Sequence, residues 1–155
     1  MPIIYDKPIL TDIPQMQRIV AKEVQEGVIL RRSDDELATN IRSYITARDA
    51  ETKSIVGYVA LHIHSMRLGE IRSLIVAEGY RHHRIGSHLV ERALEEGRRL
   101  KLQEVLALTY MGHFFERLGF VEIPKEAIPE HKIWADCIKC IHFPVCNEIS
   151  LIKKL

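Results

Sequence analysis

The chain has 155 residues, of which 46% are hydrophobic and 28% are charged, and its formal net charge at pH 7 is +1. This balance is typical of one globular domain with its own core, and a near-neutral chain without a basic block gives no indication of a nucleic-acid partner. The N-terminus has no basic segment followed by an apolar run, and no apolar stretch approaches the roughly 20 residues of a membrane span. We therefore expect a cytoplasmic protein without a membrane partner.

The hydrophobic pattern predicts an alternation of strands and helices. In chain order these are a strand at 3–9, helices at 11–27 and 33–43, strands at 44–50, 54–64 and 68–77, a helix at 84–100, a strand at 105–108, a short helix at 114–118, and strands at 120–123 and 148–153. Thr11 is the expected N-cap of the first helix, and Ser33 and Glu36 have the spacing of a capping box. The pattern favours one mixed α/β domain over 1–155, with a cysteine-containing tail from about residue 124.

The most informative segment is Gly69–Leu89, in which an apolar strand leads through a short loop into a strongly amphipathic helix. The backbone N–H groups at the start of such a helix have no intrahelical acceptor, and the helix dipole adds positive potential there. This arrangement binds phosphate groups, and Arg81 and Arg84 add cationic charge. The segment therefore predicts an anion site at the start of the helix.

Residues Arg81 to Gly86 resemble the signature Q/R-x-x-G-x-G/A of the GNAT acetyltransferases. Arg84 stands where the first glycine is usual, and we expect it to keep helical dihedrals. Thr109 to Phe120 resembles the family's closing element, in which an aromatic pair and a final Gly-Phe lead into the next strand. The resemblance implies the GNAT fold, with a central mixed sheet flanked by helices, and it implies acetyl-CoA as the cosubstrate.

The same resemblance implies where coenzyme A lies. In the family the strand before the loop separates from its neighbour and pairs with the pantetheine amides, a role that falls here on Leu74, Ile75 and Val76. The diphosphate then falls on the residues at the start of the helix: Arg81, His82, His83, Arg84, Ile85, Gly86 and Ser87.

Acetyl transfer to an amine requires a base, an oxyanion donor and a proton donor for the leaving thiolate. Glu70 is the candidate base, because its spacing before Arg81 resembles that of the catalytic glutamate in GNAT members that use one. An apolar strand would raise its pKa, although Glu70 could instead be an exposed residue at the end of the strand. Many GNAT enzymes use a tyrosine as the proton donor to the leaving thiolate, at the position where this chain has Phe115. Thr109 and Tyr110 are therefore the remaining candidates for this donor. A strand N–H near Leu74 or Ile75 would stabilise the oxyanion.

The segment Gly27–Leu37 resembles the stretch between the first two helices of the N-acetylglutamate synthases, and the chain resembles their short, stand-alone forms. In that group an arginine binds the glutamate carboxylate, a role that we carry over to Arg31 first and Arg32 second, with Ser73 beside the substrate. The two arginines could equally be a solvated surface pair. The resemblance implies acetylation of the L-glutamate α-amine, in arginine biosynthesis. A GNAT enzyme that acts on a protein N-terminus or lysine, and a non-catalytic acyl-CoA-binding module, are the alternatives.

The three cysteines, Cys137, Cys140 and Cys146, all lie in the tail. An odd number of cysteines without a secretion signal argues against a disulfide framework. Their spacing allows zinc, but a second C-x-x-C is missing, so we favour reduced cysteines and no metal site. The sequence does not define the oligomeric state and is compatible with a homodimer.

Overall fold

The computed structural model describes residues 2–128 and 148–155, and a seven-stranded sheet forms its centre. The strands are β1 (Ile3–Asp6), β2 (Tyr44–Asp49), β3 (Ile55–Ile63), β4 (Leu68–Val76), β5 (Glu104–Thr109), β6 (Val121–Ile123) and β7 (Ile149–Lys154). The helices are α1 (Ile13–Gln25), α2 (Asp34–Thr39), α3 (Ile85–Arg99) and α4 (Gly112–Arg117). Short 3-10 turns lie at Leu10–Asp12, Ile41–Ser43, Glu78–Tyr80 and Lys125–Ala127.

The strands follow the order β1-β2-β3-β4-β5-β7-β6 across the sheet. Only β4 and β5 are parallel, and α3 forms the crossover between them. The other neighbours are antiparallel, including β7, which lies between β5 and β6. The sheet is therefore mixed, as predicted, and its two halves meet at the β4–β5 pair.

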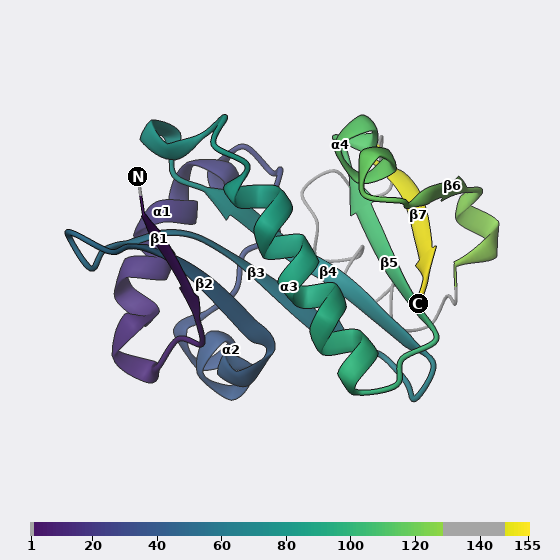
Figure 1. Ribbon diagram of the computed structural model, residues 1–155, viewed down its shortest axis with the longest axis horizontal. Helices are drawn as coiled ribbons and strands as arrows, with labels where there is room; N and C mark the ends of the chain where they lie inside the picture. The colour runs from purple at the N-terminus through teal and green to yellow at the C-terminus, as the bar shows by residue number, and fades with distance from the viewer. Residues whose placement is uncertain (1, 129–147) are drawn as a thin grey trace.

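The two faces of the sheet carry different side chains because neighbouring strand residues point in opposite directions. On β3, Val59 and Leu61 pack in the cluster that includes the buried side of α3, whereas Tyr58 and Ala60 pack in the cluster that includes α1 and Leu37 of α2. Helices thus cover both faces, and Figure 1 shows α3 lying across the front one.

The N-terminal caps agree only in part with the sequence prediction. Ser33 Oγ accepts a hydrogen bond from Glu36 N, and Ser33 N donates to Glu36 Oε1, both at 3.1 Å, which confirms the capping box. Thr11 is not an N-cap, because the 3-10 turn Leu10–Asp12 precedes a helix that begins at Ile13. The second helix ends at Thr39 instead of continuing to residue 43.

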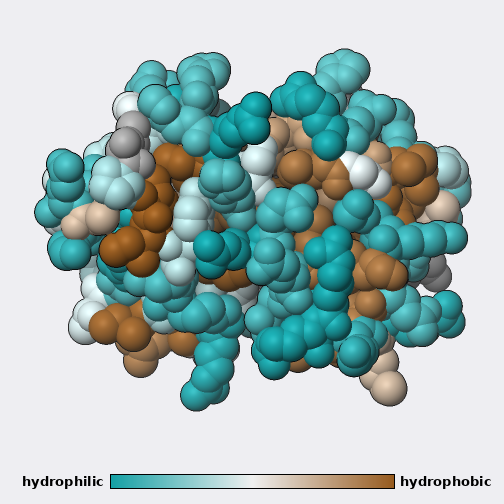
Figure 2. All heavy atoms as spheres, viewed as in Figure 1, coloured by the Kyte–Doolittle hydropathy of each residue, from teal (hydrophilic) through white to brown (hydrophobic). Residues whose placement is uncertain are grey.

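The outer face of α3 is hydrophilic, and Figure 2 shows the corresponding polar surface over the middle of the molecule. The buried positions of α3 recur every three or four residues, which is the spacing of one helix face: Ile85, Leu89, Val90, Ala93, Leu94 and Gly97. Within residues 2–128 and 148–155, no helix combines the length and apolar character needed to cross a bilayer.

Candidate active site

The strands β4 and β5 pair only near their starts, and this opens a V at the centre of the sheet. Their register runs from Leu68 opposite Glu104 to Ile71 opposite Ala107, and no pairing follows. Figure 1 shows the two strands separating from this point towards α3's first turn and α4. The β5-facing edge of β4 from Arg72 to Val76 therefore has no partner strand within the described chain.

A β-bulge lies on β4 where the strands separate. Ile75 is opposite Tyr58 and Arg72 is opposite Ala60, so β4 uses one residue more than β3 between these pairs. Ser73, inside the bulge, has φ of 56°, in the left-handed region that a non-glycine residue rarely occupies. Bulges leave a residue outside the ladder and recur beside active sites, so the backbone at Ser73 and Leu74 is available to a ligand.

The loop that enters α3 contains the predicted anion site. Ile85 is 2% exposed and fixes the first turn of α3 in the core. Arg84, the N-cap, has φ of 63° and ψ of 15°, so our expectation of helical dihedrals was wrong. It adopts the left-handed geometry of the missing glycine, at a cost of about 1–2 kcal/mol. The N–H groups of the first helical residues, from Ile85 to Ser87, have no intrahelical acceptor.

The charge near this loop is arranged differently from the prediction. Arg84, His82 and His83 are exposed. Arg81 Nε donates to Val76 O at 3.1 Å, and its Nη2 lies 3.3 Å from Glu23 Oε2 on α1. Arg81 therefore connects the end of β4 to α1 in this structure.

A hydrogen bond ties the approach to this loop to the β2–β3 turn. Tyr80 Oη donates to Asp49 Oδ2 at 2.8 Å, and Asp49 Oδ1 accepts from Glu51 N at 2.8 Å. The hydrogen bonds from Tyr80 and the Glu51 amide lower the pKa of Asp49, and the bond to Asp49 raises the pKa of Tyr80. This pair ties the 3-10 turn Glu78–Tyr80, which precedes the loop into α3, to the β2–β3 turn.

Glu70 is buried and paired, unlike the residue in apolar surroundings that the sequence suggested. It is 6% exposed, which excludes the exposed strand-end alternative. His64 Nε2 lies 2.7 Å from Glu70 Oε1, and Arg72 Nε donates to the same oxygen at 3.1 Å. Oε2 accepts no hydrogen bond from any residue that the structure describes. One carboxylate oxygen is thus fixed, and the other is available to a water or an amine.

The two candidate donors to the leaving thiolate, Thr109 and Tyr110, differ in position. Thr109, at the end of β5, is 9% exposed, and its Oγ1 accepts a hydrogen bond from Met111 N at 2.9 Å. Its hydroxyl proton is therefore free to point elsewhere, since this bond uses only a lone pair. Tyr110 follows with an exposed side chain. Thr109 sits on the strand that faces β4 across the V, which favours it over Tyr110.

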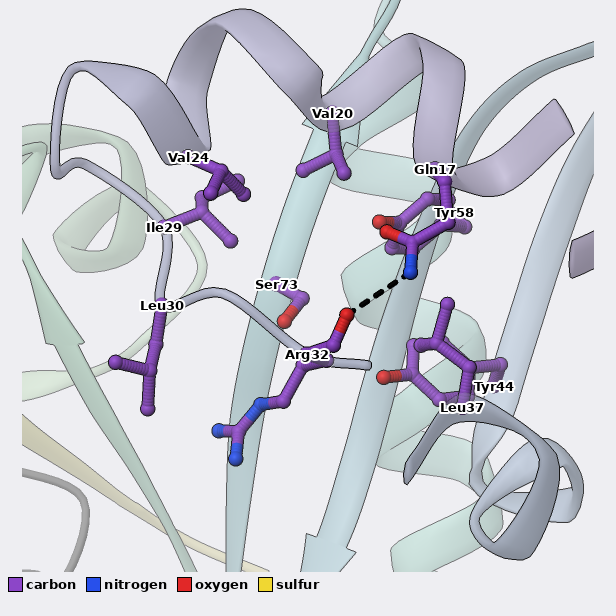
Figure 3. A pocket seen from close by; sticks show the side chains of 10 residues that line it. All are labelled: Gln17, Val20, Val24, Ile29, Leu30, Arg32, Leu37, Tyr44, Tyr58 and Ser73. Atoms are coloured by element: carbon purple, nitrogen blue, oxygen red, sulfur yellow. Dashed lines mark hydrogen bonds between the residues drawn. The ribbon is translucent and has the colours of Figure 1, made fainter. Parts of the chain in front are cut away.

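A pocket lies between α1, the segment before α2, and the strands β2, β3 and β4 (Figure 3). Its lining residues are Gln17, Val20, Val24, Ile29, Leu30, Arg32, Leu37, Tyr44, Tyr58 and Ser73. Ser73 connects this pocket to the bulge on β4. Arg32 and Ser73, both predicted as substrate-binding residues, are therefore brought to one place.

The two arginines that were predicted to bind the substrate differ in position. Arg31 is exposed and does not line the pocket, whereas the Arg32 side chain is 17% exposed and does. Gln17 Nε2 donates to Arg32 O at 2.9 Å, and Arg32 Nη1 lies 3.8 Å from Glu36 Oε2. The capping-box glutamate and α1 together place Arg32 at the pocket.

Several residues of the site were missed in the sequence. Arg72 shares a face with Glu70 because the two are separated by one strand residue, and this alternation could have identified it. His62 is opposite Glu70, and the rings of His62 and His64 meet edge-on with centroids 4.7 Å apart. No local pattern marks Tyr44, because its place at the pocket depends on how α1 and α2 pack. The three cysteines lie outside the described residues, and within those residues no group of His, Cys, Asp and Glu is arranged to hold a metal.

Comparison with known proteins identifies the family. The sequence model of the Acetyltransferase (GNAT) family matches residues 12–120, which is more than half of the chain. The chain therefore belongs to the GNAT family and is an acetyltransferase, and the predicted fold class is confirmed.

Individual relatives add detail. The chain is 38% identical over 150 residues to an uncharacterized N-acetyltransferase of Chlorobaculum tepidum, covering 94% of this chain and 92% of that protein. It is 32% identical over 114 residues to the amino-acid acetyltransferase of Mycobacterium tuberculosis, covering 73% of this chain and 65% of the relative. Among solved structures it is similar to N-acetylglutamate synthase from Neisseria gonorrhoeae complexed with coenzyme A and N-acetyl-glutamate, with a TM-score of 0.86, 20% identity, and coverage of 100% of this chain and 35% of that one. At this identity the likeness shows the fold.

Proposed function

We propose that this protein transfers the acetyl group of acetyl-CoA directly to the α-amine of an amino acid, and that this amino acid is L-glutamate. The observation that carries the proposal is the pocket beside the bulge on β4, where Arg32 and Ser73 face the same hollow. The names of the Mycobacterium tuberculosis relative and of the Neisseria gonorrhoeae structure support the same acceptor class. The reaction would serve arginine biosynthesis in the cytoplasm, with the whole chain acting as one domain.

The V between β4 and β5 is the proposed site of the cosubstrate. Acetyl-CoA supplies the acetyl group as a thioester. The unpaired edge at Leu74, Ile75 and Val76 can bind pantetheine amides in the way that an added strand would. The amides at the start of α3 can bind the diphosphate, with Arg84 nearby as a cation. Arg81 would have to leave Val76 O if that carbonyl pairs with the cosubstrate.

The carbonyl oxygen of the thioester becomes anionic during transfer and needs a donor. The bulge at Ser73 and Leu74 supplies backbone N–H groups that are outside the ladder. These N–H groups belong to the same strand edge that would align the pantetheine arm. We assign the oxyanion contact to the N–H of Leu74 or Ile75.

Glu70 is the proposed general base. Arg72 and His64 hold its Oε1, and Oε2 remains to take a proton from the ammonium group of the acceptor through a water. Glu70 does not line the pocket itself. Arg72 is linked to both, because it donates a hydrogen bond to Glu70 and its charge lowers the pKa of Tyr44 in the pocket.

The acceptor's carboxylate is assigned to Arg32, because a guanidinium can donate two parallel hydrogen bonds to a carboxylate. The part-buried position of this arginine makes the contact stronger than it would be at a fully exposed one. Thr109, whose Oγ1 keeps its proton while it accepts from Met111 N, is assigned to donate a hydrogen bond to the leaving thiolate, which then takes its proton from solvent.

Thiol release with acetyl-CoA and each proteinogenic amino acid tests the proposal. We expect L-glutamate to give the highest kcat/KM, and turnover of a peptide N-terminus or lysine in its absence would contradict the assignment. Glu70→Gln keeps the size and both neighbours but cannot accept the proton. It should lower kcat by about 100-fold or more while leaving acetyl-CoA affinity unchanged. Glu122→Gln, at an exposed position of β6, is the matched control.

A further inference from the structure

Two tyrosines on neighbouring strands form the floor of the acceptor pocket. Tyr44 is 4% exposed and Tyr58 is 2% exposed. They are diagonal neighbours on β2 and β3, and their rings meet edge-on with centroids 5.6 Å apart. Both rings belong to the core cluster under α1, whereas both residues also line the pocket. Each tyrosine thus has a ring in the core and a hydroxyl at the pocket.

Neither hydroxyl has a hydrogen-bond partner among the residues that the structure describes. Two other tyrosines of the chain do, since Tyr5 Oη is 3.1 Å from His88 Nδ1 and Tyr80 Oη donates to Asp49 at 2.8 Å. Both hydroxyls are therefore free to donate a hydrogen bond to a water or to a ligand in the pocket. Two such donors at one pocket can be paired together by an acceptor group on a bound molecule.

Both hydroxyls act as donors. Burial raises the pKa of Tyr44, against the opposing effect of the Arg32 and Arg72 charges. Burial also raises the pKa of Tyr58, with a further contribution from Tyr44. The protons therefore stay on both oxygens throughout the neutral pH range. Arg32 likewise has donors only. Figure 3 shows the Tyr44 hydroxyl directed towards the segment that carries Arg32.

The chemistry that suits these donors best is a carboxylate, which accepts about four hydrogen bonds and has the charge opposite to that of Arg32. We propose that Tyr44 and Tyr58 are specificity-determining residues, which donate hydrogen bonds from their hydroxyl groups to a carboxylate of the amino-acid acceptor beside Arg32. This inference rests on the proposed function, because it assumes that the pocket holds the acceptor. A hydrocarbon or ammonium group at the same place offers no acceptor and would leave both hydroxyls without a partner in the bound molecule.

The test uses Tyr44→Phe and Tyr58→Phe, which keep the rings in the core and remove one oxygen each. The Tm of the unliganded protein should stay the same or rise, because no hydrogen bond within the described chain is lost. The KM for L-glutamate should rise about tenfold or more in each variant, as for loss of a hydrogen bond to a charged group, with the KM for acetyl-CoA unchanged. Tyr5→Phe, which removes a hydroxyl on the opposite face near α3, is the matched control and should change neither constant.

The two monomethyl esters of glutamate identify the carboxylate that is bound. With the ester that blocks this carboxylate, the wild type should have a high KM, and the tyrosine variants should raise it no further. An unchanged glutamate KM in both variants would overturn the inference, and so would an equal rise of the glutamate and acetyl-CoA constants or a fall in Tm. If the wild type turned over no amino acid at all, the proposed function would fail, and this inference would fail with it.

Discussion

Gly86 offers a direct probe of the cosubstrate site at the scale of one residue. A Cβ built there would lie 3.5 Å from Phe114 Cζ and 3.8 Å from Val76 Cγ2, which are ordinary contacts. The fold therefore does not require a glycine at this position. Its value as a probe lies in its position between the end of β4 and α4, where the proposed diphosphate and pantetheine arm would pass.

Gly86→Ala should separate binding from folding. Alanine is favoured over glycine in helices by up to about 1 kcal/mol, so the Tm should rise by as much as about 4 °C. The KM for acetyl-CoA should increase about tenfold or more, because the methyl group would crowd the bound cosubstrate. Thermal unfolding and thiol-release kinetics give the two values.

Gly79→Ala provides the control, since a Cβ there meets nothing within 4 Å. It lies in the 3-10 turn just before the loop and should leave the acetyl-CoA constant unchanged. If Gly86→Ala and the wild type had equal KM values for acetyl-CoA, the cosubstrate would not bind next to Gly86, and the proposed position would be wrong.

Individual side chains were predictable only where the strand or motif alone fixes them. The location of Glu70 on the central strand followed from its spacing, but its pairing with His64 depends on the β3–β4 hairpin. The choice between Arg31 and Arg32 could not be made from the sequence, because it depends on the direction in which the segment before α2 leaves α1. The left-handed Arg84 was missed because the loop geometry outweighs the intrinsic preference of the residue.

At the scale of elements, the hydrogen bond from Tyr80 to Asp49 joins the turn before α3 to the β2–β3 turn. The pKa of Asp49 is lowered in the folded protein, so the carboxylate stabilises the fold above its unfolded pKa of about 4, and this contribution is lost as pH falls through the folded value. The pKa of Tyr80 is raised, so its contribution is present below about pH 10 and is lost as pH rises above that value.

Tyr80→Phe should consequently lower the Tm by a constant amount between about pH 5 and pH 9. The difference from the wild type should shrink towards zero below about pH 4 and again above about pH 10. Thermal unfolding of both proteins across this range measures it. A Tm difference that persists undiminished at pH 3 would show that the ring of Tyr80, and not the bond to Asp49, accounts for the stabilisation.

The helices and strands themselves were largely predictable, because their hydrophobic periods are clear. The capping box at Ser33 and the strand–loop–helix around α3 were confirmed with small shifts of their ends. The bulge at Ser73 was not predicted, since no glycine marks it and its register depends on β3. Thr11 failed as a cap because Asp12 Oδ2 accepts from Ile9 N and stabilises a 3-10 turn there.

At the scale of the whole molecule, the order of the strands in the sheet could not be predicted from local sequence patterns. The last strand, β7, enters between β5 and β6, so the sheet order differs from the chain order. This insertion completes the half of the sheet that carries β5 and Thr109, whereas the other half carries β4 and the proposed acceptor pocket. The V between the halves, on which the proposed activity depends, is a property of the assembled sheet.

Titration of the 15N-labelled protein with coenzyme A, followed by amide NMR, tests the central claim most directly. The account predicts saturable binding, with the largest shifts at the N–H groups of residues 73–76 and 82–87. Pantetheine, which lacks the diphosphate, should shift the first group and leave the second nearly unchanged. No binding at millimolar coenzyme A, or shifts confined to other parts of the chain, would contradict the account.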